Sequence, residues 1–320
     1  MTITVIVCTH NRCRSLAKTL ESVLRQTLHD PVEWEILVVD NNSKDNTRAV
    51  VQDFQERFPG RFRYVFEANQ GVSHARNAGI REARGEILVF IDDDETATDG
   101  WLQNITCNLH GEKWMGAGGP VVSVWDRPEP RWLKARNSFT MGPISAFDFH
   151  AVQDQDQELT DPPIGANMAF KKEAFVRLGG FRTDLGRKGK TLLSNEDTEF
   201  GRRLMANGYQ MVWAPTAILY HPVEENRLSK LYFQRWWFNK GRSDIVEKGD
   251  HFHGTQLFRV LLRILYDASV EVIRWAITRN PSERFTARLK VYAYAGQAFQ
   301  HCRQSSETKK DRSLLGAKEQ

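Results

Sequence analysis

The sequence predicts an α/β protein with a mostly parallel sheet that carries helices on both faces, followed by a C-terminal helical segment. In the first half of the chain, short runs of β-branched and other apolar residues alternate with helical patterns, which is typical of such a sheet. From residue 226 onward, longer helical patterns follow. The chain has 320 residues, of which 41% are hydrophobic and 26% charged, so it can bury a sizeable core.

The predicted elements follow from the spacing of apolar residues. The run over residues 3–9 barely alternates, so it is expected to form a strand buried on both faces. Residues 14–25 place their leucines on one stripe of a helix. Asn46 or Thr47 is expected to cap the second helix and Ser73 the third. The further expected elements are strands over residues 34–39, 62–66, 86–91 and 164–170, strand-like residues 211–220, helices ending near residues 58 and 83, and helices over 172–178, 196–207, 256–277 and 284–299.

Charge is distributed unevenly along the chain. The net charge is +4, which is too small a surplus to indicate nucleic acid as a partner. Residues 1–225 carry a net charge of −5, whereas residues 226–320 carry +9. This asymmetry indicates a metal or phosphate site in the first part and an anionic surface as the partner of the second.

The cysteines and the start of the chain indicate a reducing compartment. The N-terminal residues run directly into the first strand pattern without a basic leader or a small-residue cleavage site. We therefore expect a cytoplasmic protein. The four cysteines have no CxxC or paired spacing and are predicted to be reduced thiols: Cys8, Cys13, Cys107 and Cys302.

Polar residues gather where the predicted strands end. The segments 9–12 and 40–43 follow the first two strands, and 92–94 follows the fourth. Between the third strand and its helix lie residues 69–77, where Arg76 and a helix N-terminus could meet an anion. In open sheets of this type, ligands bind beyond the carboxyl ends of the strands, so these segments are expected to line one crevice. Taken singly, each segment is also explained by turn and cap chemistry.

Three successive carboxylates stand at Asp92, Asp93 and Asp94. They would repel one another unless a cation or hydrogen-bond donors offset their charge. Hard divalent cations such as Mg2+ or Mn2+ take carboxylate oxygens, and Mg2+ is usually held by one or two carboxylates together with substrate phosphates. A solvated acidic turn is the alternative for an isolated triplet, and the polar residues at the other strand ends favour the metal site.

Six segments follow one another over roughly residues 3–221: Thr9-His10-Asn11-Arg12, Val38-Val39-Asp40-Asn41-Asn42-Ser43, Ala75-Arg76-Asn77-Ala78-Gly79-Ile80, Asp92-Asp93-Asp94, Gly165-Ala166-Asn167 and Glu196-Asp197-Thr198-Glu199-Phe200. As an ordered set, they resemble the family 2 glycosyltransferases of GT-A fold, which implies a Rossmann-like GT-A domain over residues 1–225. For the rest of the chain we expect a helical, basic and amphipathic region over 226–305 and a disordered tail over 306–320.

The resemblance also implies which residues contact a nucleotide diphosphate sugar donor. Asp40 matches the residue that hydrogen-bonds the nucleotide base, with Thr9 and Arg12 beside it and Arg76 near the base or the diphosphate. Asp92 matches the residue that holds the ribose or the donor sugar, and Asp93 is placed to reach the ribose.

Metal binding and catalysis are implied for four further residues. Asp94 matches the ligand of the Mn2+ or Mg2+ ion that bridges the two phosphates, and His221 stands where a further ligand is expected. A structural turn histidine before Pro222 stays open as the alternative. Asp197 matches the catalytic base and Glu196 the neighbour that orients the acceptor or the base. Ordinary acidic residues in the first turn of a helix are the alternative for this pair.

The activity implied is an inverting, metal-dependent glycosyl transfer to the hydroxyl of a saccharide or a lipid-linked saccharide. A departing diphosphate gathers negative charge that a divalent cation neutralises, and a single displacement needs one carboxylate to take the proton of the acceptor. Two alternatives stay open. A nucleotidyl- or phosphotransferase would need a similar site, although the chain lacks a GxxxxGK phosphate loop. A non-catalytic nucleotide-binding module on a membrane surface is the other.

The C-terminal segment is expected to form amphipathic helices. Within residues 256–277 charges recur every three or four positions, which excludes a membrane-spanning helix. The helix can pack on the core, on a second copy in a homodimer, or on a membrane interface at the inner face of the plasma membrane. The aromatic and basic residues 232–242 either dock a helix on the catalytic domain or meet a diphosphate. Together with the net +9, this pattern favours an acceptor at an anionic membrane face.

The stretch from Trp125 to Pro163 has no clear periodicity and contains several prolines. A stretch of this length is either disordered or a mobile functional loop, and we expect it to become ordered when donor or acceptor binds.

Overall fold

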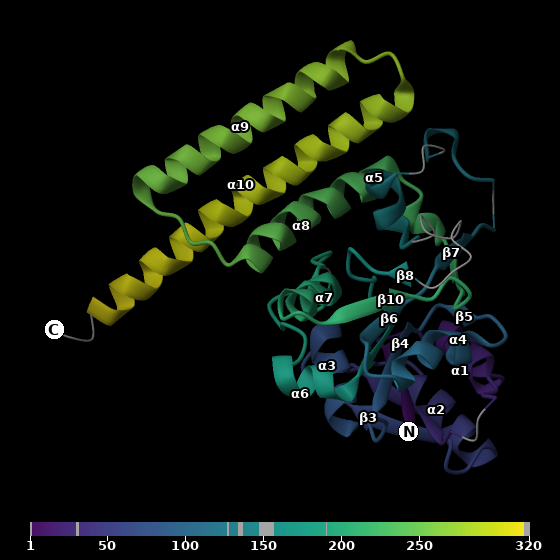
Figure 1. Ribbon diagram of the computed structural model, residues 1–320. Coiled ribbons are helices and arrows are strands. Elements are labelled where there is room, and N and C mark those ends of the chain that lie inside the picture. Colours follow the sequence, from purple (N-terminus) through teal and green to yellow (C-terminus); the bar gives the residue numbers. More distant parts are fainter. Residues whose placement is uncertain are drawn as a thin grey trace. The chain divides into compact units, whose positions relative to one another are not determined.

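The computed structural model describes residues 2–29, 32–126, 128–133, 137–146, 157–189 and 191–316 (Figure 1). Their contacts divide the chain into two compact units. Unit 1 comprises Met1–Asp126, Ile144–Gly189 and Glu196–Val223, and unit 2 comprises Arg127–Pro143, Lys190–Asn195 and Glu224–Gln320. The change from one unit to the other at residue 224 lies next to the boundary expected at residue 225, while two short earlier segments belong to unit 2.

An eight-stranded sheet forms the centre of unit 1 in the described residues. Its strand order is β3-β2-β1-β4-β9-β6-β10-β8. The first four strands pair in parallel, as do β6 and β10, whereas β9 and β8 run antiparallel to their neighbours. The predicted mostly parallel sheet is therefore confirmed. The strands are β1 (Ile3–Thr9), β2 (Trp34–Asp40), β3 (Phe62–Phe66), β4 (Ile87–Asp92), β6 (Trp114–Gly118), β8 (Gln157–Glu158), β9 (Asn167–Lys171) and β10 (Gln210–Trp213).

Helices cover both faces of this sheet, as predicted. Side chains that point to opposite faces of β1 enter two different cores: Val5 packs with one face and Ile6 with the other. Buried residues of α1 (Cys13–Leu24), α2 (Thr47–Arg57) and α4 (Trp101–Thr106) belong to the first core. Buried residues of α3 (Val72–Glu82), α6 (Lys172–Leu178) and α7 (Glu196–Ala206) belong to the second. The strand over residues 3–9 is thus buried on both faces.

A second, three-stranded sheet lies in unit 1. It consists of β5 (Thr96–Ala97), β11 (Leu219–Pro222) and β7 (Val121–Val124). The strand-like run expected over residues 211–220 is therefore two strands in different sheets. Pro215 lies between them and cannot donate a ladder hydrogen bond, which favours the interruption.

The predicted cap of the third helix is wrong. Helix α3 begins at Val72, and its N-cap is Gly71 with a φ of 142°. This backbone conformation favours glycine. Ser73 lies inside the helix, where its hydroxyl donates to the backbone oxygen of Leu185 at 2.9 Å.

Unit 2 is helical in its described residues. Helix α10 (Pro281–Gly316) packs against both α8 (Lys230–Lys248) and α9 (Gly254–Ile277), and it lies between them in Figure 1. Helix α10 continues past residue 306, where a disordered tail was expected, as far as Gly316. Among the described residues, no helix is long and apolar enough to cross a membrane.

The stretch from Trp125 to Pro163 contains short elements where it is described. They are the 3-10 helices Arg131–Leu133 and Gly142–Ile144, helix α5 (Ser138–Met141) and strand β8. Residues 127, 134–136 and 147–156 of this stretch lie outside the described residues. A further 3-10 helix spans Cys107–His110 and another Glu225–Arg227.

Candidate active site

The register of three parallel strands brings their polar ends to one edge of the sheet. Thr9 of β1 lies opposite Asp40 of β2, and Cys8 of β1 lies opposite Asp92 of β4. Because the strands are parallel, the three loops that follow them leave the sheet at the same edge. The predicted gathering of Thr9, Asp40 and Asp92 is therefore found in the structure.

Asp40 is buried and held in one orientation by its own chain. One carboxylate oxygen, Oδ1, accepts from the backbone N–H of Ser43 at 2.8 Å, and the other accepts from the hydroxyl of Tyr64 at 2.8 Å. Burial, together with the hydrogen bond to Asp40, raises the pKa of Tyr64 to about 12, so the hydroxyl stays a donor at neutral pH. The sequence analysis did not single out Tyr64, because it sits within a strand two positions before its end.

His10 and Asn41 tie together the loops that follow β1, β2 and β3. The backbone oxygen of Asn41 can only accept, so Nδ1 of His10, 2.8 Å away, carries the proton. Nε2 of His10 lies 3.1 Å from the amide nitrogen of Gln70. The amide of Asn41 donates to the backbone oxygens of Glu67 and Asn69 and accepts from the N–H of Gly71 at 2.7 Å. These two side chains position the strand-end loops, a role that sequence spacing does not reveal.

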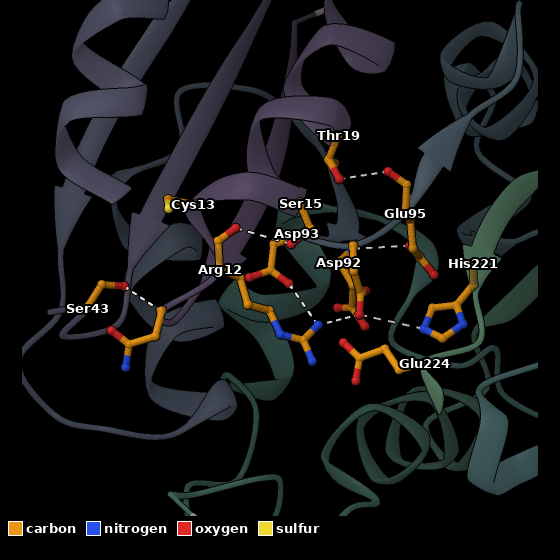
Figure 2. A network of polar contacts seen from close by, with 12 residues as sticks. Arg12, Cys13, Ser15, Thr19, Ser43, Asp92, Asp93, Glu95, His221 and Glu224 are labelled. Atoms are coloured by element: carbon orange, nitrogen blue, oxygen red, sulfur yellow. Dashed lines mark hydrogen bonds and ion pairs between the residues drawn. The ribbon is translucent and has the colours of Figure 1, made fainter. Parts of the chain in front are cut away.

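The acidic cluster Asp92–Glu95 follows β4 and is in contact with Arg12. Figure 2 shows Arg12 and His221 on opposite sides of this cluster. The guanidinium of Arg12 contacts Asp94 and lies 3.4 Å from Asp93 Oδ1. Arg12, which was expected beside Asp40, thus lies against the carboxylates. Burial raises the pKa of Asp93 to about 7, Asp94 adds to this effect and Arg12 opposes it.

Glu95 is a fourth carboxyl group of the cluster that the sequence analysis missed. It is completely buried, and one of its oxygens accepts from the backbone N–H of Asp92 at 3.2 Å. Burial and the charges of Asp92 and Asp94 raise its pKa well above the ordinary value. Its side chain therefore supports the turn that carries the aspartates. The run of four acidic residues in the sequence is the signal that could have drawn attention to it.

Asp94 and His221 form a pair that suits a divalent cation. Nε2 of His221, on β11, lies 3.7 Å from Oδ2 of Asp94, and both side chains are buried. Two ligands on one Mg2+ ion, each about 2.1 Å from it, are at most about 4.2 Å apart, so both atoms can bind the same ion. Carboxylate oxygen and imidazole nitrogen are ordinary ligands of Mn2+. The residue set present thus fits such a cation.

No group of three or more His, Cys, Asp or Glu side chains suited to a metal is found among the described residues. A cation held by Asp94 and His221 would therefore keep coordination positions for oxygen atoms of a ligand and for water. Mg2+ sites that include substrate phosphates have this character.

Arg76 joins the acidic cluster to the start of α7. It is 4% exposed, and its guanidinium lies 2.8 Å from Glu196, 3.4 Å from Asp92 and 3.2 Å from the backbone oxygen of Gly165. A Cβ atom at Gly165 would lie 2.5–2.9 Å from this guanidinium, so glycine permits the close approach. Arg76, expected near a base or diphosphate, is thus held by two carboxylates of its own chain.

Asp197 and Glu196 have different surroundings although they are neighbours in the chain. The two oxygens of Asp197 accept from the backbone N–H groups of Gly165 and Thr198. Glu196 is buried, and its Oε2 atom has no hydrogen-bond partner in the described part of the chain. Burial raises the pKa of Glu196 to about 7, and the charge of Asp197 adds to this effect while Arg76 opposes it.

The ten predicted site residues all lie in unit 1. The structure brings most of them into two contact groups that meet at consecutive residues of the acidic cluster. One group comprises Arg12, Asp93, Asp94 and His221, and the other comprises Arg76, Asp92 and Glu196. Asp197 joins the second group through Gly165, whose N–H it accepts from and whose backbone oxygen accepts from Arg76. Asp40 and Thr9 lie on neighbouring strand ends of the same sheet edge.

Comparison with known proteins adds an independent finding. The family model described as glycosyl transferase family 2 matches residues 4–179. The succinoglycan biosynthesis protein ExoM of Rhizobium meliloti is 28% identical over 252 residues, which are 78% of this chain and 75% of the relative. A glucosyl-dolichyl phosphate glucuronosyltransferase of Haloferax volcanii is 28% identical over 243 residues, 74% of this chain and 75% of the relative.

Solved structures show the same fold at low sequence identity. A mannosyltransferase of Pyrobaculum calidifontis, PcManGT, in complex with GDP-Man and Mn2+, superposes with a TM-score of 0.62 at 20% identity, covering 93% of this chain and 86% of that one. GalNAc-T7 with UDP, GalNAc and Mn2+ superposes with a TM-score of 0.54 at 14% identity, covering 79% and 52%. The predicted GT-A architecture is thereby confirmed.

Proposed function

The chain belongs to glycosyl transferase family 2, and from that premise we propose that it moves a sugar, with inversion, from a nucleotide diphosphate sugar to a saccharide or lipid-linked saccharide hydroxyl. Membership of this family makes the protein a glycosyltransferase and decides against the nucleotidyl- or phosphotransferase and the non-catalytic module. The inversion, the metal requirement, the donor and the acceptor are the proposed part.

The observation that carries the proposal is the pairing of Asp94 with His221 beside a sheet edge lined by further carboxylates. In a transfer from a nucleotide diphosphate sugar, negative charge develops on the departing diphosphate. A divalent cation held by these two side chains would neutralise that charge where it arises. The Mn2+ in the complexes of two structural neighbours is consistent with such a cation.

On the donor side, the proposed roles follow the strand ends. Asp40, fixed by Tyr64 and Ser43, offers carboxylate oxygens to N–H groups of the base, with Thr9 on the neighbouring strand. Asp92 and Asp93 take hydroxyl groups of the ribose or the sugar. The side chain of Arg12 is 33% exposed, so a diphosphate can reach it and take over part of its contact with Asp93 and Asp94.

On the acceptor side, Asp197 is the proposed base. Two backbone N–H groups orient its carboxylate, and a carboxylate so placed can take the proton of the attacking hydroxyl. One base is sufficient for a single displacement, which inverts the anomeric carbon. Glu196 and Arg76 form the buried support behind Asp197.

The acceptor class rests on the relatives. One acts, by its name, on a glucosyl-dolichyl phosphate, which is a lipid-linked sugar, and another takes part in the synthesis of the polysaccharide succinoglycan. We therefore infer a saccharide acceptor, free or linked to a lipid phosphate, in the synthesis of a polysaccharide or glycan.

A metal-dependent transfer assay tests the proposal. The purified chain is incubated with a panel of uridine and guanosine diphosphate sugars, with saccharide acceptors and with Mn2+, and the release of nucleoside diphosphate is measured. We expect release with at least one donor, its loss in EDTA and its recovery with added Mn2+. Release that is the same in EDTA would contradict the metal role, and a product of retained anomeric configuration would contradict the single displacement.

Two variants separate the metal site from general effects of lost charge. Asp94→Asn should abolish Mn2+-dependent donor binding, because it weakens a cation ligand. Asp53→Asn removes an equal charge from α2, where the side chain is 60% exposed, and should leave donor binding unchanged. Equal binding by both variants would remove Asp94 from the proposed metal site.

A further inference from the structure

Helix α9 is an outer helix of unit 2 with one face uncovered. It packs against α10, whereas α10 packs against both α9 and α8 (Figure 1). Half-buried or buried side chains of α9, including Leu257, Leu261, Ile264 and Ala268, recur every three or four residues. This spacing places them on one side of the helix, as expected for the side that packs on α10.

The opposite side of α9 is apolar as well. Six large apolar side chains on it are between 49% and 73% exposed, and we call them the apolar stripe: Phe258, Leu262, Leu265, Tyr266, Ile273 and Ile277. Their separations of 4, 3, 1, 7 and 4 residues keep them on one helix face. A soluble helix normally turns polar residues to water, so this stripe indicates an interaction surface.

Basic side chains border one flank of the stripe. Arg259, Arg263 and Arg274 lie on the exposed surface of α9. Two of these arginines lie beside the acidic residues of the helix, since Asp267 pairs with Arg263 at 3.2 Å and Glu271 lies 3.5 Å from Arg274 and 3.0 Å from Lys290. With three arginines against two acidic residues, α9 has a net charge of +1. Residues 226–320 as a whole carry a net charge of +9. The helix that carries the stripe and the C-terminal region around it in the sequence therefore both have a positive net charge.

We propose that the apolar stripe inserts into the interface of an anionic lipid membrane, with its arginines at the headgroups. Helices with an apolar face and a basic polar face bind such membranes in the plane of the interface. Each Lys or Arg near an anionic surface adds to the attraction. The binding is independent of the glycosyl transfer.

A second copy of the chain is a less suitable occupant. Stable protein interfaces use roughly 20–30 residues a side, whereas the stripe offers six on the ridge of a single helix. A second copy would also bring the same arginines toward this positively charged helix. An anionic bilayer instead supplies the opposite charge and a continuous apolar layer.

Vesicle binding of the full chain tests the proposal. We expect the chain to sediment with vesicles of phosphatidylcholine and phosphatidylglycerol, and to bind vesicles of phosphatidylcholine alone at least about tenfold more weakly. Raising the NaCl concentration should weaken binding to the anionic vesicles. Equal binding to both kinds of vesicle, with no effect of salt, would overturn the electrostatic part of the proposal.

Substitutions separate the stripe from the rest of the surface. Leu262→Glu with Leu265→Glu should lower the affinity for anionic vesicles by about 100-fold, because it places two charges on the face that enters the membrane. The matched control is Val176→Glu on α6, where the side chain is 79% exposed, and it should bind as the unmodified chain does. Arg259→Gln should weaken binding to anionic vesicles about fivefold and leave binding to phosphatidylcholine unchanged.

Two further measurements keep the outcomes distinct. Circular dichroism and thermal unfolding report whether the double variant is folded, and nucleoside diphosphate release with a water-soluble acceptor should be the same in it as in the unmodified chain. Vesicle binding that survives in the folded double variant would overturn the proposal. A stable dimer that the double variant converts to a monomer, without vesicle binding in either, would assign the stripe to a second copy instead.

Discussion

At the scale of single residues, the neighbouring carboxyl groups of Glu196 and Asp197 lie in different surroundings. Asp197 accepts from two backbone N–H groups, which orients it without neutralising it by a cationic side chain. Glu196 is buried against Arg76, and burial raises its pKa to about 7. Glu196 is buried, whereas Asp197 is half-buried, so an acceptor hydroxyl can reach Asp197 more readily. Asp197 is the better base on these grounds.

Asp197→Asn should therefore abolish transfer and spare donor binding. An amide cannot take the proton of the acceptor hydroxyl, and loss of a general base costs about 10²- to 10⁴-fold in rate. Donor binding, measured by calorimetry with Mn2+ present, should change little, because Asp197 acts on the acceptor. The measurement that checks the rate is kcat for nucleoside diphosphate release with acceptor present.

The matched control for Asp197 is Glu199→Gln in the same turn of α7. Glu199 pairs with Arg203 at 2.9 Å, so its loss alters a partly buried ion pair of the same helix. We expect kcat to stay within about twofold of the unmodified value, because glutamine keeps the shape of the side chain and an oxygen that accepts from Arg203. Near-normal turnover of Asp197→Asn, or equal losses in both variants, would refute the base assignment.

Glu196 should make the protein less stable as the pH rises from about 5 to about 8. Its pKa is raised from 4.5 to about 7 in the folded state, so the folded protein holds this proton more tightly than the unfolded chain. The stabilising contribution is complete below pH 4.5 and is lost as the pH rises through 7. The full effect is on the order of 3 kcal/mol.

Comparison with Glu196→Gln isolates this contribution. The free energy of unfolding, from urea titrations at several pH values, should fall with pH more steeply in the unmodified protein than in the variant, which cannot ionise at this position. Parallel pH profiles would show that Glu196 does not titrate in this range. A profile that falls more steeply in the variant would show that the ion pair with Arg76 outweighs burial.

At the scale of structural elements, Gly165 joins the segment before β9 to α3 and α7. Its backbone N–H donates to Asp197, its backbone oxygen accepts from Arg76, and it leaves no room for a side chain at the guanidinium. Gly165→Ala should displace Arg76 from Glu196 and Asp92. We expect a loss of stability of roughly 1–3 kcal/mol, typical of overpacking, together with reduced turnover.

The control for Gly165 is Gly111→Ala, where a Cβ atom would meet nothing within 4 Å and φ is −86°. Its free energy of unfolding should stay within about 0.5 kcal/mol of the unmodified value, as at ordinary surface positions. Urea unfolding of both variants checks the pair. A stable and fully active Gly165→Ala would mean that Arg76 can move without consequence.

The sequence predicted the elements better than the partners of the side chains. Strand ends could be located because buried apolar runs stop at polar residues, and parallel strands bring those ends together, as for Thr9 and Asp40. Arg12 meets Asp93 across 81 positions of the chain, and Arg76 meets Glu196 across 120. Such contacts depend on how the loops fold, which local spacing does not encode. Tyr64 was missed because it lies within β3, two positions before the end of the strand.

Caps and short strands were also hard to predict. Serine is a common N-cap residue, yet the N-cap of α3 is Gly71 and not Ser73. The backbone at Gly71 has a φ of 142°, and its N–H donates to the side-chain oxygen of Asn41. The run over residues 211–220 looks like one strand, but its two ends belong to different sheets. Only the second of these strands carries His221 to Asp94, so the metal pair could be suspected from the sequence but not located.

At the scale of the whole molecule, the net charge changes sign near residue 225, next to the last change from unit 1 to unit 2 at residue 224. Residues 1–225 carry a net −5 and contain the acidic cluster, whereas residues 226–320 carry +9 and contain the apolar stripe. An acidic site that must bind an anionic diphosphate needs a counter-charge, and the two arginines that contact the cluster, Arg12 and Arg76, are already paired with its carboxylates. The charge balance of the site thus argues that cation and donor bind together.

Thermal unfolding should reveal this joint binding. A nucleoside diphosphate alone meets the carboxylates of the site, and Mn2+ alone finds two protein ligands, so each should raise Tm little. Together they should stabilise unit 1 by about 2.7 kcal/mol when the diphosphate is at about 100 times its Kd. For a unit of this size, that corresponds to a rise in Tm of roughly 5–10 °C.

The decisive quantity in this experiment is how far the rise in Tm with Mn2+ and diphosphate together exceeds the sum of the rises with each alone. EDTA should remove the joint shift, and Asp94→Asn should abolish it while Asp53→Asn on the surface of α2 retains it. A panel of uridine, guanosine, adenosine and cytidine diphosphates would at the same time identify the base that Asp40 accepts. A diphosphate that gives the full shift in EDTA would show that Arg12 and the loop N–H groups suffice, and the cation would then have no place in donor binding.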